Sequence, residues 1–353
     1  MKRIFASLVA ILLSLTLLVA CSSNSAGTDV TTNKNNMSSD APSTKPEVTL
    51  EFGHIQNPGH ALAVAPEEFK ALVEKESNGR VEVKLYPSSQ LGSAREMMEQ
   101  VTMGTLDMTC CDTADWAATL NIPQLAVFNL PFLTKDLSTQ AELIRTIVAE
   151  EVPKMLKGSG VRLLMTYSNG IRQPLLKKAP INSLEDIKGL KMRTAETPLY
   201  VNLWNCLGAS TVTSAWSEAY TILQQGVADA VEADATGLVN QNLQEQGKYL
   251  SKIGHLGAIY CVLMNENKWN SIPTDLKEII QKCALESQEK QLSSRQAADD
   301  SAEKKMEEAG VKINDVSLEE RNRMKDACKP IYDKFEEEYD LGDLIGRMLA
   351  LNN

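Results

Sequence analysis

A regular alternation of strand-like and helix-like patterns, beginning near residue 48, limits most strongly the folds open to this chain. Residues 48–55 alternate apolar and polar side chains, which predicts a β-strand, and a helical pattern follows to residue 76. Residues 80–86 predict a second strand, followed by a helix to residue 103 and a strand over residues 105–111. This order predicts an α/β layer with a largely parallel sheet, in which ligands bind at the carboxyl ends of the strands.

A second α/β set follows from residue 161 to about residue 255. Its expected strands are residues 161–167, 175–176, 190–193, 211–212 and 229–232. The apolar run at residues 258–264 predicts a buried strand that returns to the first sheet. Residues 273–310 form one long helical pattern that ends at a glycine. Such a helix is roughly 54 Å long, so we expect it to brace two lobes.

The first residues have the pattern of a lipoprotein signal peptide. Lys2 and Arg3 precede an apolar run over residues 4–19, and Leu-Val-Ala-Cys at residues 18–21 matches a lipobox. We therefore expect residues 1–20 to be removed and Cys21 to be lipidated, which would anchor the protein to the outer face of the cell membrane. The alternative, a transmembrane anchor, needs about 20 apolar residues, more than this run supplies. Residues 21–46 are rich in Ser, Thr, Asn and Asp and predict a flexible tether.

The chain is acidic, with a formal net charge of −10, which argues against a nucleic-acid partner. An anionic ligand must then be attracted by local arginines rather than by the overall field. The cysteines beyond Cys21 show no Cys-x-x-Cys pair and no nearby histidine, so no metal site or cofactor is predicted. The sequence leaves open whether these cysteines are thiols or disulfides: Cys110, Cys111, Cys206, Cys261, Cys283 and Cys328.

Two arginines stand in short segments that suit the binding of a carboxylate. Arg172 lies within residues 168–173, Ser-Asn-Gly-Ile-Arg-Gln. Arg193 ends the run Lys-Gly-Leu-Lys-Met-Arg at residues 188–193, which predicts a strand. A guanidinium held at a strand end can offer two parallel donors to a carboxylate, and its fixed fork does so better than a lysine.

The order of several motifs resembles one transport family. Residues 86–92 read Tyr-Pro-Ser-Ser-Gln-Leu-Gly, residues 104–107 read Gly-Thr-Leu-Asp, and residues 129–133 read Asn-Leu-Pro-Phe-Leu. Together with the two arginine segments, they resemble the solute-binding subunit of tripartite ATP-independent periplasmic (TRAP) transporters, from Val48 to the C-terminal helices. The resemblance implies an α/β, two-lobe periplasmic-binding-protein (Venus-flytrap) fold, with the long helix bracing both lobes.

The resemblance also implies domain boundaries and partners. The first lobe is expected to comprise residues 47–167 plus about 258–297, and the second residues 168–257 plus about 298–353 with the C-terminal helices. An extracytoplasmic protein of this kind hands a small carboxylate to a small and a large TRAP membrane subunit, which an ion gradient drives.

Site residues follow from the same resemblance. Arg193 corresponds to the arginine that binds the ligand carboxylate, Arg172 to a second arginine found in some relatives, and Trp216 to an aromatic residue that lines the pocket. Asp112 and Asp115 stand where sialic-acid-binding relatives have a glutamate and an arginine.

Three further residues are candidates for hydrogen bonds to the ligand. Ala233 stands where relatives often have an asparagine that reaches the ligand, so the flanking Glu232 and Asp234 are the candidates to replace that contact. Gln56 follows the first expected strand, where an amide can reach a ligand, although turn residues look the same.

Carboxyl groups in an acid-binding cleft repel a second ligand carboxylate but accept hydrogen bonds from hydroxyls. Asp112, Asp115 and Trp216 therefore favour a sugar acid, such as a uronate or aldonate. The alternatives are a C4-dicarboxylate or keto acid, or a subunit that presents its ligand to a sensor. A hydrolase is disfavoured because no nucleophile motif, phosphate loop or zinc motif is present. The sequence does not decide the exact acid, its affinity or the oligomeric state.

Overall fold

Ten strands form one continuous sheet in the computed structural model, which describes residues 45–352. The strands are β1 (Val48–Gly53), β2 (Val81–Tyr86), β3 (Met108–Asp112), β4 (Val161–Leu176), β5 (Lys191–Thr194), β6 (Ser210–Thr213), β7 (Ala230–Ala233), β8 (Tyr249–Lys252), β9 (Leu256–Asn265) and β10 (Lys312–Asp315). The main path runs β2-β1-β3-β9-β4-β7-β5-β6, while β8 pairs with β4 and β10 beside it. The expected signal peptide, Cys21 and nearly all of the tether lie outside the described residues.

The first lobe is built around β1, β2 and β3, which are parallel as the sequence predicts. Helix α1 (Ala61–Glu76) and helix α2 (Ala94–Met103) follow the first two strands in the predicted order. Leu50 and Phe52 of β1 are fully buried, and Phe52 meets Phe69 of α1 edge to face, with ring centroids 6.5 Å apart. The alternating pattern of β1 thus directs its apolar face towards α1.

The second lobe is built around β5, which pairs in parallel with β6 on one side and β7 on the other. These strands are only four residues long, and their connections carry α6 (Pro198–Cys206), α7 (Ala219–Gln224) and α8 (Ala235–Asn240). Since the strands are parallel, their carboxyl ends meet at one edge, where the loops can form a site.

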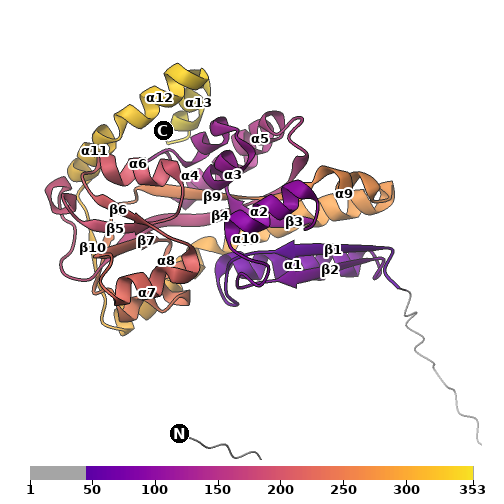
Figure 1. Cartoon of the computed structure of the whole chain (residues 1–353), viewed down its shortest axis with the longest axis horizontal. Helices are drawn as coiled ribbons and strands as arrows, with labels where there is room; N and C mark the ends of the chain where they lie inside the picture. The colour runs from indigo at the N-terminus through magenta and orange to yellow at the C-terminus, as the bar shows by residue number, and fades with distance from the viewer. Residues whose placement is uncertain (1–44, 353) are drawn as a thin grey trace, which may run out of the picture. The chain divides into compact units, whose positions relative to one another are not determined.

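Two long antiparallel strands, β4 and β9, cross between the lobes (Figure 1). The predicted return of residues 258–264 to the first sheet is confirmed, because β9 pairs with both β3 and β4. The sequence predicts two separate strands where β4 is a single strand. The reason is a register shift between Ser168 and Ile171, a β-bulge that interrupts the pattern.

The predicted long helix is α10 (Thr274–Glu308), and it packs against α1 of the first lobe, β4, and α8 of the second. Its Gln291 donates to the carbonyl oxygen of Ser168 at 2.7 Å and accepts from the Ser168 amide at 3.0 Å. These bonds hold the bulge of β4, where neighbouring strands cannot satisfy the backbone. The helix therefore braces both lobes, as expected.

The remaining elements complete the two lobes and the C-terminal region. The other α-helices are α3 (Thr113–Leu120), α4 (Leu137–Leu143), α5 (Ala149–Met155), α9 (Glu266–Ser271), α11 (Leu318–Ala327), α12 (Lys329–Tyr339) and α13 (Gly342–Ala350). The shorter helical turns are η1 (Pro123–Asn129), η2 (Ile144–Val148), η3 (Leu184–Ile187), η4 (Trp216–Glu218) and η5 (Leu243–Glu245). Across residues 45–352, no helix combines the length and the hydropathy needed to cross a bilayer. The six cysteines in this part of the chain are free thiols.

Candidate functional site

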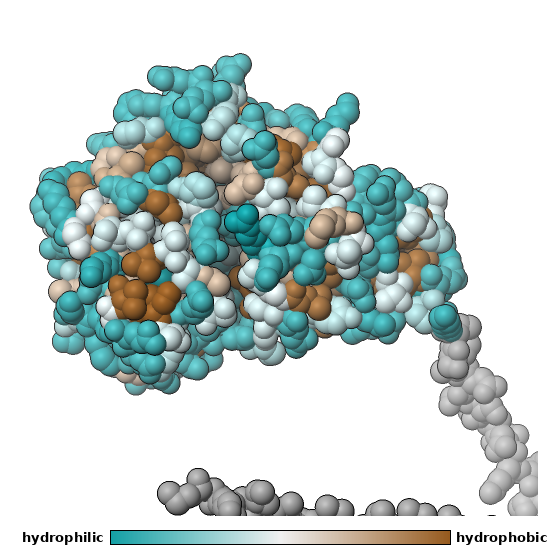
Figure 2. Space-filling view, in the orientation of Figure 1, coloured by the Kyte–Doolittle hydropathy of each residue, from teal (hydrophilic) through white to brown (hydrophobic). Residues whose placement is uncertain are grey.

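A cavity of about 370 Å³ lies between the two lobes, within the size range of small-ligand sites. On the face shown in Figure 2, hydrophilic residues gather between the lobes, with apolar residues on either side. Seven of the residues expected to form the site line this cavity: Gln56, Asp112, Asp115, Arg172, Arg193, Trp216 and Asp234. The structure thus brings together residues that are far apart in the sequence.

Arg193 lies in β5, and its side chain is almost completely buried. Its Nε donates to Ser214 Oγ at 3.1 Å and its Nη2 donates to the Ser214 carbonyl oxygen at 2.5 Å. The guanidinium carbon is 5.4 Å from the centroid of the Trp216 ring, within cation–π distance. No carboxylate of residues 45–352 forms an ion pair with it. Burial lowers the pKa of Arg193 to about 10, so the group still carries its charge at neutral pH.

Arg172, in β4, differs from Arg193 because it has a counter-charge within the protein. Its Nε donates to Glu232 Oε2 at 2.6 Å, and its Nη2 donates to Glu232 Oε1 at 2.9 Å. Burial acts to lower the pKa of Arg172, but the ion pair with Glu232 raises that pKa well above its ordinary value. The positive charge of Arg172 is therefore neutralised before any ligand binds.

Glu232 is not among the residues that line the cavity, in contrast to the expectation that it contacts the ligand. It is fully buried and also accepts from Thr194 Oγ1 at 3.1 Å, while His255 Nε2 lies 3.2 Å from its Oε2. Although burial raises the pKa of a carboxyl group, Arg172 and His255 hold the pKa of Glu232 at about 2. Its oxygens are used by this network, which explains why they are not available to a ligand.

Asp112 caps the N-terminus of α3 and also lines the cavity. Its Oδ1 accepts from the Ala114 amide at 2.8 Å and from the Asn129 side-chain amide, and its Oδ2 accepts from the Tyr200 hydroxyl at 2.5 Å. Burial and the nearby Asp115 raise the pKa of Asp112 to about 7. Asp112 therefore both caps α3 and contributes to the wall of the cavity.

Asp115 lies one turn further along α3 and is half-buried. It accepts a hydrogen bond from the hydroxyl of Thr197, just before α6. Burial raises its pKa, whereas this hydrogen bond and Arg172 act in the opposite direction. Because α3 belongs to the first lobe and α6 to the second, both aspartates connect the lobes at the cavity.

Two buried amide oxygens at the cavity have no hydrogen-bond partner among the described residues. They are Oε1 of Gln56, after β1, and Oδ1 of Asn169, in the bulge of β4. Each of these oxygens can accept a hydrogen bond from a water molecule or from a hydroxyl group in the cavity. Asn169 was not predicted as a site residue. The only sequence feature that marks it is the Asn-Gly pair at residues 169–170, and such a pair is equally typical of a turn.

Tyr260 and His60 also line the cavity and were not predicted as site residues. Tyr260 lies in β9, where every residue is buried, so its sequence context indicates core. His60 caps α1 by accepting from the Leu62 amide at 2.9 Å. Trp216 is half-buried and faces Arg193, whereas Asp234 is buried and caps α8.

A two-lobed α/β protein with a buried guanidinium that forms no ion pair, placed between its lobes, has the features of a protein that binds and encloses a small anion. The chain belongs to family 7 of the bacterial extracellular solute-binding proteins, which it matches over residues 52–338. The resemblance to TRAP solute-binding subunits is thereby confirmed.

Three relatives illustrate the similarity. The C4-dicarboxylate-binding periplasmic protein DctP of Rhodobacter capsulatus is 27% identical over 299 residues, covering 84% of this chain and 89% of the relative. A TRAP periplasmic solute-binding protein of Pseudomonas putida F1, solved with D-glucuronate, is 27% identical with a TM-score of 0.79, covering 85% and 96% of the two chains. One from Bradyrhizobium sp., solved with D-galacturonate, is 25% identical with a TM-score of 0.80, covering 86% and 99%. The expected fold is confirmed by these likenesses.

Proposed function

We propose that the protein captures a sugar acid with one carboxylate, such as a uronate or an aldonate, and delivers it to the small and large subunits of a TRAP permease. The observation that carries this proposal is the buried guanidinium of Arg193, which forms no ion pair with a carboxylate of residues 45–352. A ligand carboxylate would supply that charge and accept two parallel N–H bonds. The solved relatives with bound glucuronate and galacturonate support the ligand class.

The charges around the cavity favour one ligand carboxylate over two. Arg172 is paired with Glu232, so Arg193 is the cation at the cavity that a ligand has to neutralise. A second carboxylate would also meet the carboxyl groups of Asp112 and Asp115, at a cost that rises in a buried site. A C4-dicarboxylate, as bound by the Rhodobacter capsulatus relative, is therefore the second candidate.

The remaining groups at the cavity suit hydroxyls. Gln56 and Asn169 present unpartnered amide oxygens, and Asp115 adds a carboxyl group, so all three can accept a hydrogen bond from a ligand hydroxyl. Trp216 offers an aromatic face on which the C–H face of a sugar ring can pack. These groups bind and orient a ligand, and none is arranged as a nucleophile with an adjacent base, so we infer binding without turnover.

Attachment to the membrane through lipidated Cys21 forms part of the same proposal, on the strength of the lipobox. Presentation of the bound ligand to a sensor remains the alternative use of the same site.

Isothermal titration calorimetry with D-glucuronate, D-galacturonate, D-galactonate, succinate and a 2-keto acid tests the proposal. The sugar acids should bind more tightly than succinate. Arg193→Lys, which keeps the charge but loses the fork, should weaken binding by about 2 kcal/mol or more, the range for truncating a buried charge pair. Arg145→Lys, at an exposed pair with Glu289, is the matched control and should bind like the wild type.

Tighter binding of succinate than of every sugar acid would overturn the ligand class. Equal affinity of Arg193→Lys and the wild type would remove Arg193 as the anchor. Mass spectrometry of the ligand recovered after incubation should show an unchanged acid, and a converted product would contradict a purely binding role.

A further inference from the structure

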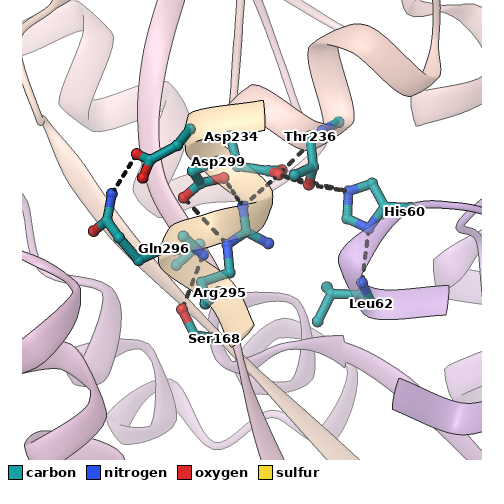
Figure 3. Close-up of polar contacts among 12 residues, drawn as sticks. His60, Leu62, Ser168, Asp234, Thr236, Arg295, Gln296 and Asp299 are labelled. Carbon is teal, nitrogen blue, oxygen red and sulfur yellow. Dashed lines mark hydrogen bonds and ion pairs between the residues drawn. The ribbon is translucent and has the colours of Figure 1, made fainter. Parts of the chain in front are cut away.

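A chain of polar contacts runs from the first lobe across the cavity edge to the second lobe and on to α10 (Figure 3). It consists of His60 at the start of α1, Thr236 and Asp234 at the start of α8, and Arg295 with Asp299 on α10. We call these five residues the inter-lobe chain. His60 and Asp234 also line the cavity, so the chain lies beside the proposed ligand.

The direction of each hydrogen bond in the inter-lobe chain can be deduced. Nδ1 of His60 accepts from the Leu62 amide, so in the neutral ring the proton is on Nε2. Nε2 lies 3.4 Å from Thr236 Oγ1 and 3.6 Å from Asp234 Oδ2. Thr236 uses its own hydrogen to donate to Asp234 at 2.5 Å, and its oxygen is left to accept from His60. The donors of His60 and Thr236 therefore both point towards Asp234.

The far end of the inter-lobe chain is fixed to the long helix. Arg295 Nη2 donates to Asp234 Oδ2 at 2.7 Å and to Asp299 Oδ1 at 2.5 Å, and its side chain is almost fully buried. Gly170 makes room for this guanidinium, since a Cβ at that position would lie 2.5 Å from Nη2. Asp234 is thus held in place by α10, whereas the contact between His60 and Thr236, at 3.4 Å, lies near the upper limit for a hydrogen bond.

We propose that His60 is a positioning residue that stabilises the closed, ligand-bound arrangement, through a hydrogen bond from Nε2 to Thr236 that shortens as the lobes close. The proposal rests on the proposed function, because closure requires a ligand between the lobes. The contact joins the lobes directly, and it is the one bond of the inter-lobe chain that is free to change when they move. Its main effect is on ligand release, since a contact made after capture acts on the dissociation rate.

The test uses variants that remove the contact but keep the helix cap. His60→Asn retains a good N-cap acceptor for α1 but is too short to reach Thr236. Thr236→Val removes the accepting oxygen at nearly constant shape, and Thr236→Ser is the matched control that keeps it. Stopped-flow kinetics with D-glucuronate should show dissociation about two- to tenfold faster in His60→Asn and in Thr236→Val, the range for one neutral hydrogen bond. The association rate should change little, and Thr236→Ser should behave like the wild type.

The double variant distinguishes this contact from two independent defects. If His60 and Thr236 act through one bond, the double variant should dissociate no faster than the more affected single variant. Multiplying effects, or dissociation rates equal to the wild-type rate, would overturn the proposal.

A second measurement follows the distance between the lobes directly, in the presence of saturating D-glucuronate. Met103 in the first lobe and Val227 in the second are both exposed. Each can be replaced by a ketone-bearing amino acid, which reacts with a nitroxide label while the cysteines remain unmodified. Electron–electron double resonance should show a longer inter-lobe distance population in His60→Asn than in the wild type. Identical distance distributions would overturn the proposal, whereas failure of every acid to bind the wild type would overturn the proposed function alone.

Discussion

Replacing Glu232 with glutamine should change both the stability of the protein and the class of acid that it prefers. Glu232 is fully buried and pairs with Arg172 through bonds of 2.6 and 2.9 Å, and Thr194 and His255 supply two more polar contacts. Glutamine keeps the shape of the side chain. It removes the charge, however, and replaces one carboxylate oxygen by an NH2 group, which then faces the N–H donors around it.

The cost to the ligand-free protein follows from the loss of this counter-charge. Removing one partner of a buried ion pair costs about 3–5 kcal/mol, and we expect about 3 kcal/mol because glutamine keeps one acceptor oxygen. Urea denaturation of the ligand-free protein measures this change as a lower midpoint with an unchanged m-value. Glu185→Gln removes an exposed ion pair with Arg323 and should leave the midpoint almost unchanged.

The same substitution should alter ligand preference, because Arg172 then joins Arg193 as an uncompensated cation at the cavity. The ratio of the succinate Kd to the D-glucuronate Kd, measured by calorimetry, should fall about tenfold, which corresponds to about 1.4 kcal/mol. A variant as stable as the wild type would show that the ion pair does not neutralise Arg172. An unchanged ratio of the two Kd values, whatever the stability of the variant, would show that the number of unpaired arginines at the cavity does not set the ligand class.

Two further predictions concern groups around the cavity. Because burial and Asp115 raise the folded-state pKa of Asp112 to about 7, the folded protein binds more protons than the unfolded chain between about pH 4 and 7. The stability contributed by this group is therefore full below that window and is lost as the pH rises through it. Asp112→Asn should remove up to about 1.4 kcal/mol per pH unit of this slope in denaturation measured at several pH values, and an unchanged slope would contradict the raised pKa. Gly170→Ala should destabilise the protein more than Gly158→Ala: both have a positive φ, +71° and +83°, but only at Gly170 does the added Cβ meet Arg295, at 2.5 Å. The expected difference in unfolding free energy is about 1–3 kcal/mol, and equal losses would refute the steric argument.

The long elements of the fold were predictable because their patterns are local. Strand β9 is a continuous apolar run, and α10 keeps its helical pattern over 35 residues. Strands β8 and β10 were not predicted, since each has four residues and exists through pairing with a segment far away in sequence. The single strand β4 was read as two because its bulge at residues 168–171 places Asn and Gly inside it.

The sequence predicted seven residues that line the cavity, but it missed Asn169, Tyr260 and His60, and it did not predict how the charged residues pair. Arg193 and Arg172 lie in recognisable segments, yet the sequence gives no sign that Glu232, 60 residues after Arg172, neutralises one arginine and leaves the other free. The histidine at the start of α1 reads as a cap, which it is, but its second nitrogen faces the other lobe. These contacts join residues that are far apart in the sequence, so no local sequence pattern predicts them.

The buried arginines explain why ligand capture and stability should be coupled in this protein. Arg172 is compensated by Glu232, and Arg295 by Asp234 and Asp299, so the fold supplies counter-charges where they stabilise structure. Arg193 is equally buried but has two neutral contacts to Ser214 and an aromatic face in place of a carboxylate. Burying such a charge lowers the stability of the ligand-free state, and an acid that supplies the missing charge restores it. Because binding to the folded state alone adds RT ln(1 + [L]/Kd), about 2.7 kcal/mol at 100 times Kd, the proposed acid would supply the counter-charge of the third buried arginine.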